Sequence, residues 1–422
     1  MVSEWVPGVR SASVGVWIAV GSRHERAGEA GAAHYLEHLL FKGTARRTAA
    51  AIAEEIDAVG GELNAFTGKE HTCFYAHVLD SDLPLAVDLL SDVVTAATMA
   101  PEHVELERTV VLDEIAMRAD DPEDLLGEVF DTAMFGDHPL GRPVIGSLDS
   151  INGMTRAALH GFWRRHYTPA RMVVAAAGNV DHRRVVELVS RAFPGAADRD
   201  PAGATGGPGA AGPVPGGQDA PPDSAAGLVL HSEDTEQAHL MLGLPGIDHR
   251  DRRRTALEVL NTALGGGMSS RLFQQVREQR GLAYSVYSAT SSYHDAGQLS
   301  VYAGCQPDRL GEVAGVVRGV LDEVAHGGLT EAEVRRAQGA LRGGLVLGLE
   351  DTASRMYRIG RHEVDLGRQR SLRQSLAEIE AVRPDEVAEV AAELLRGPLT
   401  TAVVGPYDSD ADLPETLRSP RR

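Results

Sequence analysis

Two histidines four residues apart, with a glutamate between them, form the strongest chemical signature in the chain. The run His34-Tyr35-Leu36-Glu37-His38 would place both imidazoles on one face of a helix, with Cβ atoms roughly 5–6 Å apart. Both rings could then reach one metal ion at the ~2.0–2.1 Å of a zinc–nitrogen bond. Glu37 would stand beside the metal without having to bind it. This arrangement is typical of a metal that activates water and a carboxylate that accepts the proton.

The alternative interpretation is a surface helix that carries two solvated histidines. The flanking residues disfavour it because they are too apolar for a solvated helix. They are Ala32, Ala33, Leu36, Leu39, Leu40 and Phe41. We therefore expect both histidines to face a core or a cleft.

A catalytic zinc site needs a third protein ligand and keeps its fourth position open. Residues 101–118 are predicted to form a helix, because Pro101 suits a first turn and no glycine interrupts the segment. Glu107 and Glu114 are two turns apart on this helix and therefore share a face. A carboxylate on the apolar side is costly unless it is paired or bound to metal. Both could equally be solvated helix charges, so the residues alone leave the role of Glu114 open.

The motifs together resemble the pitrilysin/insulinase metallopeptidases, and most of all the bacterial relatives of the mitochondrial processing peptidase β subunit. The resemblance rests on the histidine motif, on residues 60–72 (Gly-Gly-Glu-Leu-Asn-Ala-Phe-Thr-Gly-Lys-Glu-His-Thr) and on residues 107–117, and it covers nearly the whole chain. It implies one zinc ion per chain, held by His34, His38 and Glu114. It also implies that Glu37 is the general base and that Glu107 supports the site from behind the ligands.

A second signature lies in residues 269–286, where Arg277 is predicted to end a helix and Tyr284 to lie on the following strand. On the residues alone, a surface arginine and a packed tyrosine are the preferred interpretation. The resemblance implies instead that this pair donates hydrogen bonds to the substrate and to the tetrahedral intermediate.

The predicted strand of residues 62–67 follows the double glycine that ends a helix begun near Thr48. In the family that the chain resembles, this strand is a free edge that pairs with the substrate backbone, which gives affinity with little dependence on sequence. Asn64, Ala65 and Phe66 are therefore the expected substrate-binding residues.

Composition supports a soluble enzyme. The 422 residues, 43% of them hydrophobic, suffice for two cores of ~200 residues each. The net charge of −19 argues against a nucleic-acid partner and is compatible with basic peptides, although acidic surfaces are ordinary. We find no apolar run long enough for a membrane span and no leader pattern, so we expect a cytoplasmic protein. Cys73 and Cys305 are expected to be small buried residues.

A segment of glycine, proline, alanine and aspartate divides the chain. Such a composition cannot offset its ordering entropy by burial, so it predicts a linker. The predicted domains are a catalytic domain (1–195), a flexible linker (196–226) and an inactive homologous domain that contributes substrate-binding and dimer surface (227–422). The fold class is α+β, with two homologous α/β-roll domains from a tandem duplication. Alternation predicts strands at 14–20, 172–178, 238–244, 282–292, 298–304 and 400–405, and helical periodicity predicts helices at 83–97, 256–264 and 331–347.

The second half has no His-x-x-Glu-His motif in its corresponding helix, 256–264. The family encloses its peptide substrate in a chamber of four such domains, which implies a homodimer of this two-domain chain. Two alternatives remain, a non-catalytic assembly subunit of the same fold and the active subunit of a heterodimeric peptidase. In the family that the chain resembles, a strand precedes the segment that corresponds to residues 6–10. Only five residues precede that segment here, so the first strand is expected to be short or missing. His24, His71, His77 and His138 lack spacing partners and are expected in the core or on the surface.

Overall fold

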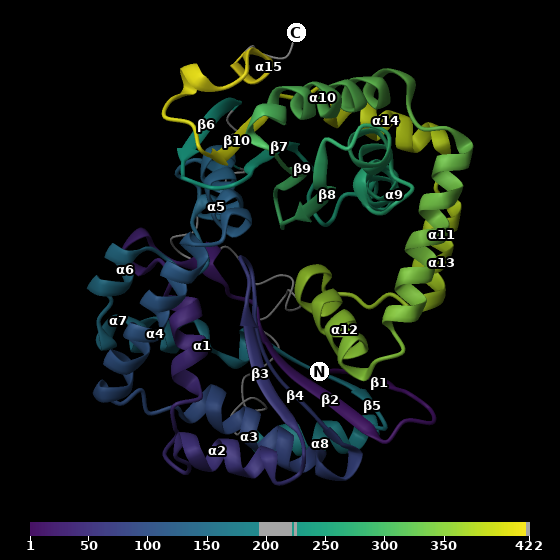
Figure 1. The fold of residues 1–422 in the computed structure, drawn as a ribbon. Helices are drawn as coiled ribbons and strands as arrows, with labels where there is room; N and C mark the ends of the chain where they lie inside the picture. The colour runs from purple at the N-terminus through teal and green to yellow at the C-terminus, as the bar shows by residue number, and fades with distance from the viewer. Residues whose placement is uncertain (194–221, 223–225, 419–422) are drawn as a thin grey trace. The chain divides into compact units, whose positions relative to one another are not determined.

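The computed structural model describes residues 1–193, 222 and 226–418, and Figure 1 shows their helices and strands. Within these residues, two five-stranded sheets have the same strand order. The first is β1-β5-β2-β4-β3 and the second is β6-β10-β7-β9-β8. In each sheet the first pair in this order is parallel and the others are antiparallel. The predicted α+β fold of two homologous halves is confirmed.

The strands of the first sheet are β1 Val2–Trp5, β2 Ser11–Ile18, β3 Glu62–Thr67, β4 Thr72–Leu79 and β5 Met172–Gly178. Those of the second are β6 Gly227–Ser232, β7 Ala238–Pro245, β8 Ala283–Ser292, β9 Gly297–Cys305 and β10 Thr400–Gly405. The helices are α1 Ala32–Leu40, α2 Ala49–Asp57, α3 Leu83–Ala96, α4 Pro101–Ala119, α5 Pro122–Phe135, α6 Leu148–Gly153, α7 Arg156–His166, α8 His182–Ala192, α9 Arg254–Gly265, α10 Leu310–Gly327, α11 Glu331–Gly348, α12 Thr352–Leu366, α13 Leu372–Ala381, α14 Pro384–Leu394 and α15 Glu415–Arg418.

The structure adds one strand at the start of each half. The alternating patterns at 14–20 and 238–244 correspond to β2 and β7, and β1 and β6 precede these strands in the chain. β1 has four residues, in line with a short first strand. β6 has no buried residue, and its alternating Leu228 and Leu230 are only partly buried against the core. The linker predicted at 196–226 lies, except for Pro222 and Ala226, outside the described residues.

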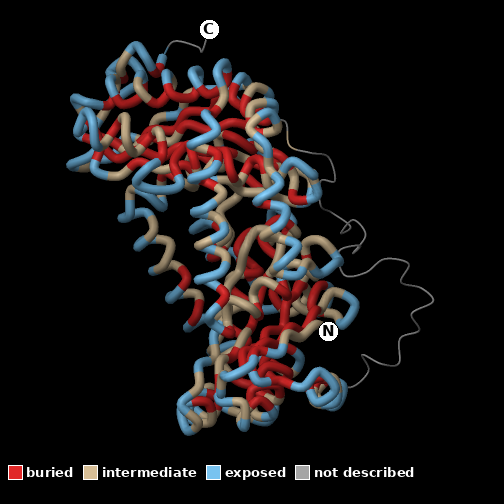
Figure 2. Tube along the Cα trace, turned by 90° about the vertical axis from the view of Figure 1, so that its right-hand side faces the viewer, coloured by how far each residue is buried: buried red, intermediate tan, exposed pale blue. Residues whose placement is uncertain are grey.

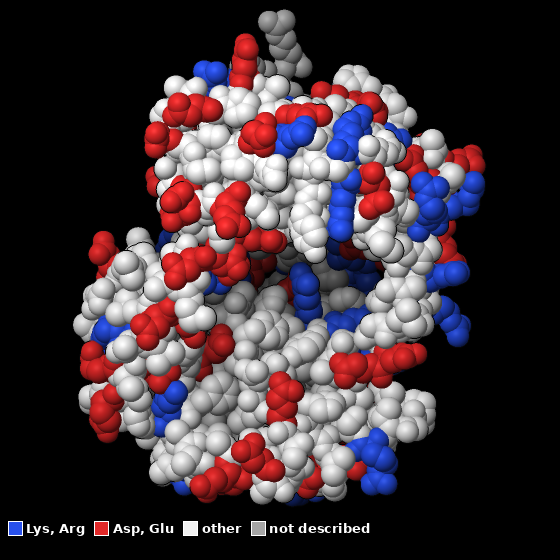
Figure 3. Space-filling model, viewed as in Figure 1, with Lys and Arg blue, Asp and Glu red and all other residues white. Residues whose placement is uncertain are grey.

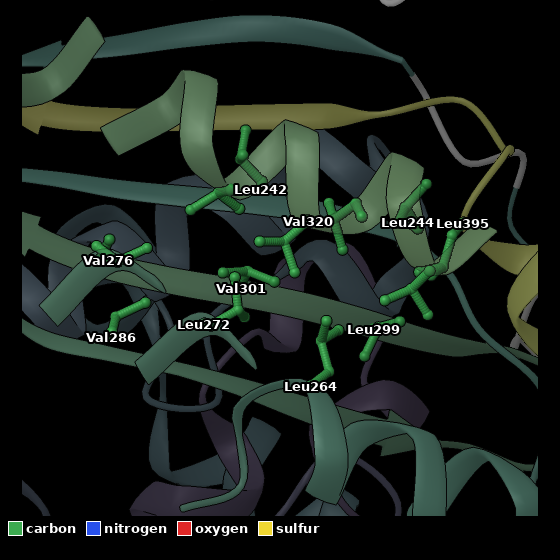
Figure 4. Packing of buried hydrophobic residues seen from close by; sticks show 14 of the residues in the cluster. Leu242, Leu244, Leu264, Leu272, Val276, Val286, Leu299, Val301, Val320 and Leu395 are labelled. Carbon is green, nitrogen blue, oxygen red and sulfur yellow. The ribbon is translucent and has the colours of Figure 1, made fainter. Parts of the chain in front are cut away.

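One face of each sheet packs against helices of its own half. Along β7, Ala238, Leu240, Leu242 and Leu244 alternate toward a core that also contains residues of α9 and α10. Figure 4 shows this packing, with Leu242 and Val301 from the sheet facing Val320 of α10. In the first sheet, Val14 and Val16 of β2 face the core that contains α1 and α3.

The opposite face of each sheet is covered by a helix from the other half of the sequence. Met356 and Ile359 of α12 pack on Trp17, Val173 and Ala175 of the first sheet. Leu126 and Phe130 of α5 pack with Tyr302, Ala402 and Val404 of the second sheet. Hydrophobic periodicity did not reveal this exchange, because it indicates that a helix has an apolar face but not which sheet that face covers.

Because of this exchange, the two compact units are not continuous in sequence. We call them the first unit, with Met1–Ala116, Leu347–Arg370 and the described part of Arg142–Asp219, and the second unit, with Met117–Gly141, Ser371–Arg418 and the described part of Ala220–Val346. Figure 2 shows buried segments concentrated within each unit.

Glycines make room for the exchanged helices. A Cβ on Gly360 of α12 would lie 2.2 Å from Nε1 of Trp17, and one on Gly15 of β2 would lie 2.6 Å from Sδ of Met356. In the second unit, a Cβ on Gly243 of β7 would lie 2.1 Å from Cζ of Phe130. Each contact is closer than van der Waals packing permits, so a side chain at any of these positions would force its neighbour to shift.

The described helices include none with the length and apolarity that crossing a membrane demands. Acidic and basic side chains are interspersed over the visible face of each unit (Figure 3). Cys73 and Cys305 are both buried and free, as expected.

The exchange predicts that Gly360→Ala destabilises the protein by about 1–3 kcal/mol, because the new methyl group would overpack the buried Trp17. Gly344→Ala is the matched control, since Gly344 is a helix glycine whose Cβ position meets nothing within 4 Å. That variant should be neutral or up to about 1 kcal/mol more stable. Urea unfolding followed by circular dichroism measures both. Equal midpoints for the two variants would contradict the packing of α12 on β2.

Candidate metal centre

Helix α1 is anchored in the core of the first unit and presents three residues out of it. Six of its nine residues are buried, namely Ala32, Ala33, Tyr35, Leu36, Leu39 and Leu40. The remaining three are His34, Glu37 and His38, all partly exposed. The solvated-helix interpretation is therefore wrong, because α1 is a core helix whose polar face carries the motif.

Helix α4 brings Glu114 to the two histidines. Its Oε2 lies 3.7 Å from Nε2 of His34 and 3.5 Å from Nε2 of His38. Tetrahedral ligands at ~2.1 Å from a zinc ion are about 3.4 Å apart. One ligand atom from each of the three residues falls within 4.8 Å of the others. The spacing thus fits the three protein ligands of a catalytic zinc site.

A polar atom without a hydrogen bond supports the same conclusion. Oε2 of Glu114 is buried and accepts no hydrogen bond from the residues that the structure describes, although it faces both imidazoles. A buried carboxylate oxygen in this state is costly unless a cation or a donor compensates it. A metal ion between the three side chains would provide that compensation.

Glu107 contacts His38 at Nδ1, the ring nitrogen that does not face Glu114. Its side chain is 2% exposed, and its Oε2 lies 3.2 Å from Nδ1 of His38. Its Oε1 lies 2.7 Å from Nζ of Lys42. With the ring proton assigned to Nδ1, His38 donates to Glu107 and leaves Nε2 free to bind a metal. Lys42 balances the buried charge of Glu107.

Glu37 is fixed by the last residue of the neighbouring strand β3. The hydroxyl of Thr67 donates to Oε2 of Glu37 at 2.5 Å. Burial raises the pKa of Glu37 above its usual value, whereas the Thr67 hydrogen bond lowers that pKa. A carboxylate with a raised pKa is a better proton acceptor near neutral pH.

Strand β3 is an edge of the first sheet, as predicted for the substrate strand. Asn64 is exposed, and its Oδ1 accepts the N–H of Ala65 at 2.8 Å. The ring of Phe66 packs against Trp17 and Tyr357, with centroids 5.6 and 5.7 Å away. The ring of Phe66 is therefore partly buried in an aromatic cluster, while Thr67 points toward α1.

The structure brings Arg277 and Tyr284 together in the second unit. The guanidinium carbon of Arg277 lies 5.0 Å from the ring centre of Tyr284 and 4.9 Å from that of Phe273. Arg277 belongs to a π-helix, Phe273–Glu278, and Tyr284 is on β8 with 77% of its surface exposed. The arginine is thus held between two rings, and the tyrosine hydroxyl lies on an accessible side chain.

Sequence reasoning missed two residues that support the site, Lys42, which pairs with Glu107, and Thr67, which donates to Glu37. Lys42 follows His38 by four residues, and it is one of only two lysines in a chain rich in arginine, a signal that could have singled it out. Thr67 ends β3 without any distinguishing pattern. His24 and His77, expected outside the site, make local hydrogen bonds to the Gly21 N–H and the Ser13 hydroxyl.

Comparison with known proteins places the chain in a family. Residues 1–148 match the family model described as insulinase (peptidase family M16), and residues 153–341 match that of the peptidase M16 inactive domain. An uncharacterised zinc protease of Mycobacterium leprae is 55% identical, with 99% of this chain and 92% of that protein aligned. One of Bacillus subtilis is 37% identical, with 96% of each chain aligned.

Solved structures agree on the fold. A protease from Helicobacter pylori superimposes with a TM-score of 0.87 at 22% identity, and a peptidase M16 inactive domain structure from Pseudomonas fluorescens with 0.84 at 20%. Both alignments cover 96% of each chain. The chain belongs to the pitrilysin/insulinase family of zinc peptidases, peptidase family M16.

The contact between Lys42 and Glu107 predicts that Lys42→Met weakens zinc binding by ~10–100-fold, as loss of a group supporting a ligand does. Lys42→Arg should restore most of the affinity, because arginine keeps a charged donor for Glu107. Arg10→Gln, which removes an exposed cation from the same unit, serves as the control. Competition with a chromophoric chelator measures the zinc dissociation constant. Wild-type affinity in Lys42→Met would show that Glu107 needs no partner.

Proposed function

We propose that the chain is a zinc-dependent endopeptidase that hydrolyses peptides or unfolded segments held in an extended conformation. The observation that carries this proposal is the convergence of His34, His38 and Glu114 at ligand spacing, with Glu37 on the next turn of the same helix face. Membership of a zinc peptidase family supports it.

His34, His38 and Glu114 would hold the zinc ion, one per chain. When bound, zinc supplies Lewis-acid chemistry, which makes water more acidic and polarises the scissile carbonyl. Glu107 keeps the ring of His38 in the orientation and tautomer that binding requires.

Glu37 moves the proton. Thr67 donates to Oε2 of Glu37, so we assign Oε1 as the oxygen that accepts the proton of the attacking water. The hydroxide adds to the carbonyl carbon, the C–N bond breaks, and Glu37 delivers the proton to the leaving nitrogen. One carboxylate thereby acts first as base and then as acid.

The substrate would pair with the free edge of β3 along Asn64, Ala65 and Phe66. Edge pairing uses backbone hydrogen bonds, so it selects extended chains more than particular sequences. To pair with Ala65, a peptide must displace the Asn64 side chain from its N–H. We further propose a homodimer whose four domains enclose the substrate, with Arg277 and Tyr284 as donors to the developing oxyanion.

Two other functions are compatible with the same fold. A non-catalytic assembly subunit would not need Glu37 and an intact ligand set, and both are present. The active subunit of a heterodimer would obtain its arginine and tyrosine from a partner, whereas Arg277 and Tyr284 are stacked in this chain. Zinc content per chain separates the first alternative from the peptidase.

Glu37→Gln should keep zinc and the fold but lower hydrolysis of an unstructured peptide by several orders of magnitude, because an amide cannot accept the proton. Glu54→Gln changes an exposed carboxylate of the same unit and should leave activity unchanged. Glu114→Gln should lose most of the bound zinc. Metal analysis and peptide cleavage followed by mass spectrometry measure these effects. Near-normal cleavage by Glu37→Gln would remove Glu37 from the mechanism.

The homodimer predicts complementation if Arg277 and Tyr284 serve the zinc site of the partner chain. Mixing Glu37→Gln chains with Arg277→Ala/Tyr284→Phe chains should restore activity, because some mixed dimers hold one intact site. With random exchange, about half of the dimers are mixed and each has one of two sites, so recovery should approach roughly a quarter of the wild-type rate. Absence of recovery despite demonstrated subunit exchange would mean that the pair acts within one chain or not at all.

A further inference from the structure

Helix α1 has no side-chain cap of its own. Its N-cap residue is Gly31, with φ of +89°. Neighbouring helices of the first unit differ, because Thr48, Thr155 and Asp181 each accept a backbone N–H of the helix that they precede. Helix starts leave N–H groups without partners, and an N-cap side chain normally satisfies one of them.

Close packing excludes any side chain at Gly31. A Cβ there would lie 2.6 Å from the carbonyl oxygen of Ile145 and 3.0 Å from Cα of Gly146. A Cβ on Gly146 would in turn lie 2.9 Å from Cα of Gly31. The start of α1 therefore cannot use the serine, threonine or aspartate that usually caps a helix.

Glu25 takes over this function from six residues upstream. Its Oε2 accepts the N–H of Gly31 at 2.9 Å, and its Oε1 accepts the N–H of Ala33 at 2.7 Å. The residue is 2% exposed. A carboxylate also interacts favourably with the positive end of the helix dipole. Burial raises the pKa of Glu25, whereas both N–H groups and the charge of Arg142 lower it and so favour the ionised carboxylate.

The segment that carries Glu25 is itself fastened to the turn after β3. The N–H of Ser22 donates to the Gly68 oxygen at 3.2 Å, and that of Arg23 to the Lys69 oxygen at 2.8 Å. Arg142 donates to the backbone oxygen of Glu25 at 3.1 Å. Glu25 is thus fixed to the hairpin of β3 and β4, and its contacts with Gly31 and Ala33 connect α1 to the same hairpin.

We propose that Glu25 is a positioning residue that sets the place of the metal-binding helix relative to β3. Ala33, which it holds, directly precedes His34, so a shift at this point moves the first zinc ligand. Thr67 makes a second connection from the same hairpin, to Glu37. The inference rests on the proposed zinc site and adds a residue to it that touches neither metal nor substrate.

Glu25→Gln tests the inference in the full-length chain. The variant keeps the size of the side chain, but its NH2 group must face one of the two N–H donors. We expect zinc affinity, measured by competition with a chromophoric chelator, to fall at least tenfold. Asp181→Ala is the matched control, because it removes the cap of α8. Asp181→Ala should lower the thermal midpoint of the apoprotein by about as much as Glu25→Gln does, and it should leave zinc affinity unchanged.

The outcomes separate this inference from the proposed function. If the wild-type chain binds no stoichiometric zinc, the proposed function fails. If the wild type binds zinc and Glu25→Gln binds it within twofold as tightly, the positioning role is overturned. If Asp181→Ala loses zinc affinity equally, the effect is one of general stability and the inference is again overturned. Should Glu25→Gln not fold, Glu25→Asp replaces it, because its shorter side chain cannot reach both N–H groups, and wild-type zinc affinity in that variant counts against the role.

Discussion

Carboxylates removed from water, each requiring a partner, organise the structure around α1. Glu107 is paired by Lys42 and by His38, Glu25 by two N–H groups at the start of α1, and Glu37 by the Thr67 hydroxyl. A buried charge without such partners would cost several kcal/mol. Since every partner lies on α1, in the residues that flank it or on β3, satisfying these carboxylates also fixes the helix that carries the two histidines of the proposed metal site.

Glu114 differs from the other carboxylates in that its buried oxygen accepts no hydrogen bond from the described residues. The protein has compensated the charges that support the site and left this one facing two imidazole nitrogens. Such an arrangement is costly in the metal-free protein and favourable with a cation bound, so metal binding and local stability are expected to be coupled.

Duplication allows the two halves to diverge in chemistry while keeping one topology. Both sheets have the same strand order, and in the chain α9 follows β7 as α1 follows β2. α9 has no His-x-x-Glu-His motif, and the second unit instead carries the stacked Arg277 and Tyr284. The exchange of α5 and α12 means that neither half of the sequence can cover both faces of its own sheet. The halves are therefore expected to fold as one chain rather than as independent domains.

The sequence by itself determined the local elements and the metal motif. The spacing of His34 and His38 requires only helical periodicity, and the strands at 62–67, 172–178 and 400–405 have the predicted bounds, because alternation and turn residues act over short distances. The choice of Glu114 over Glu107 as the proposed ligand could not come from spacing, since both lie on one face of α4. Only packing showed that Glu107 reaches Nδ1 of His38 and Lys42, while Glu114 reaches both Nε2 atoms. The roles of Glu25 and Thr67, and the exchange of α5 and α12, likewise depend on contacts between residues far apart in the chain, which local periodicity does not encode.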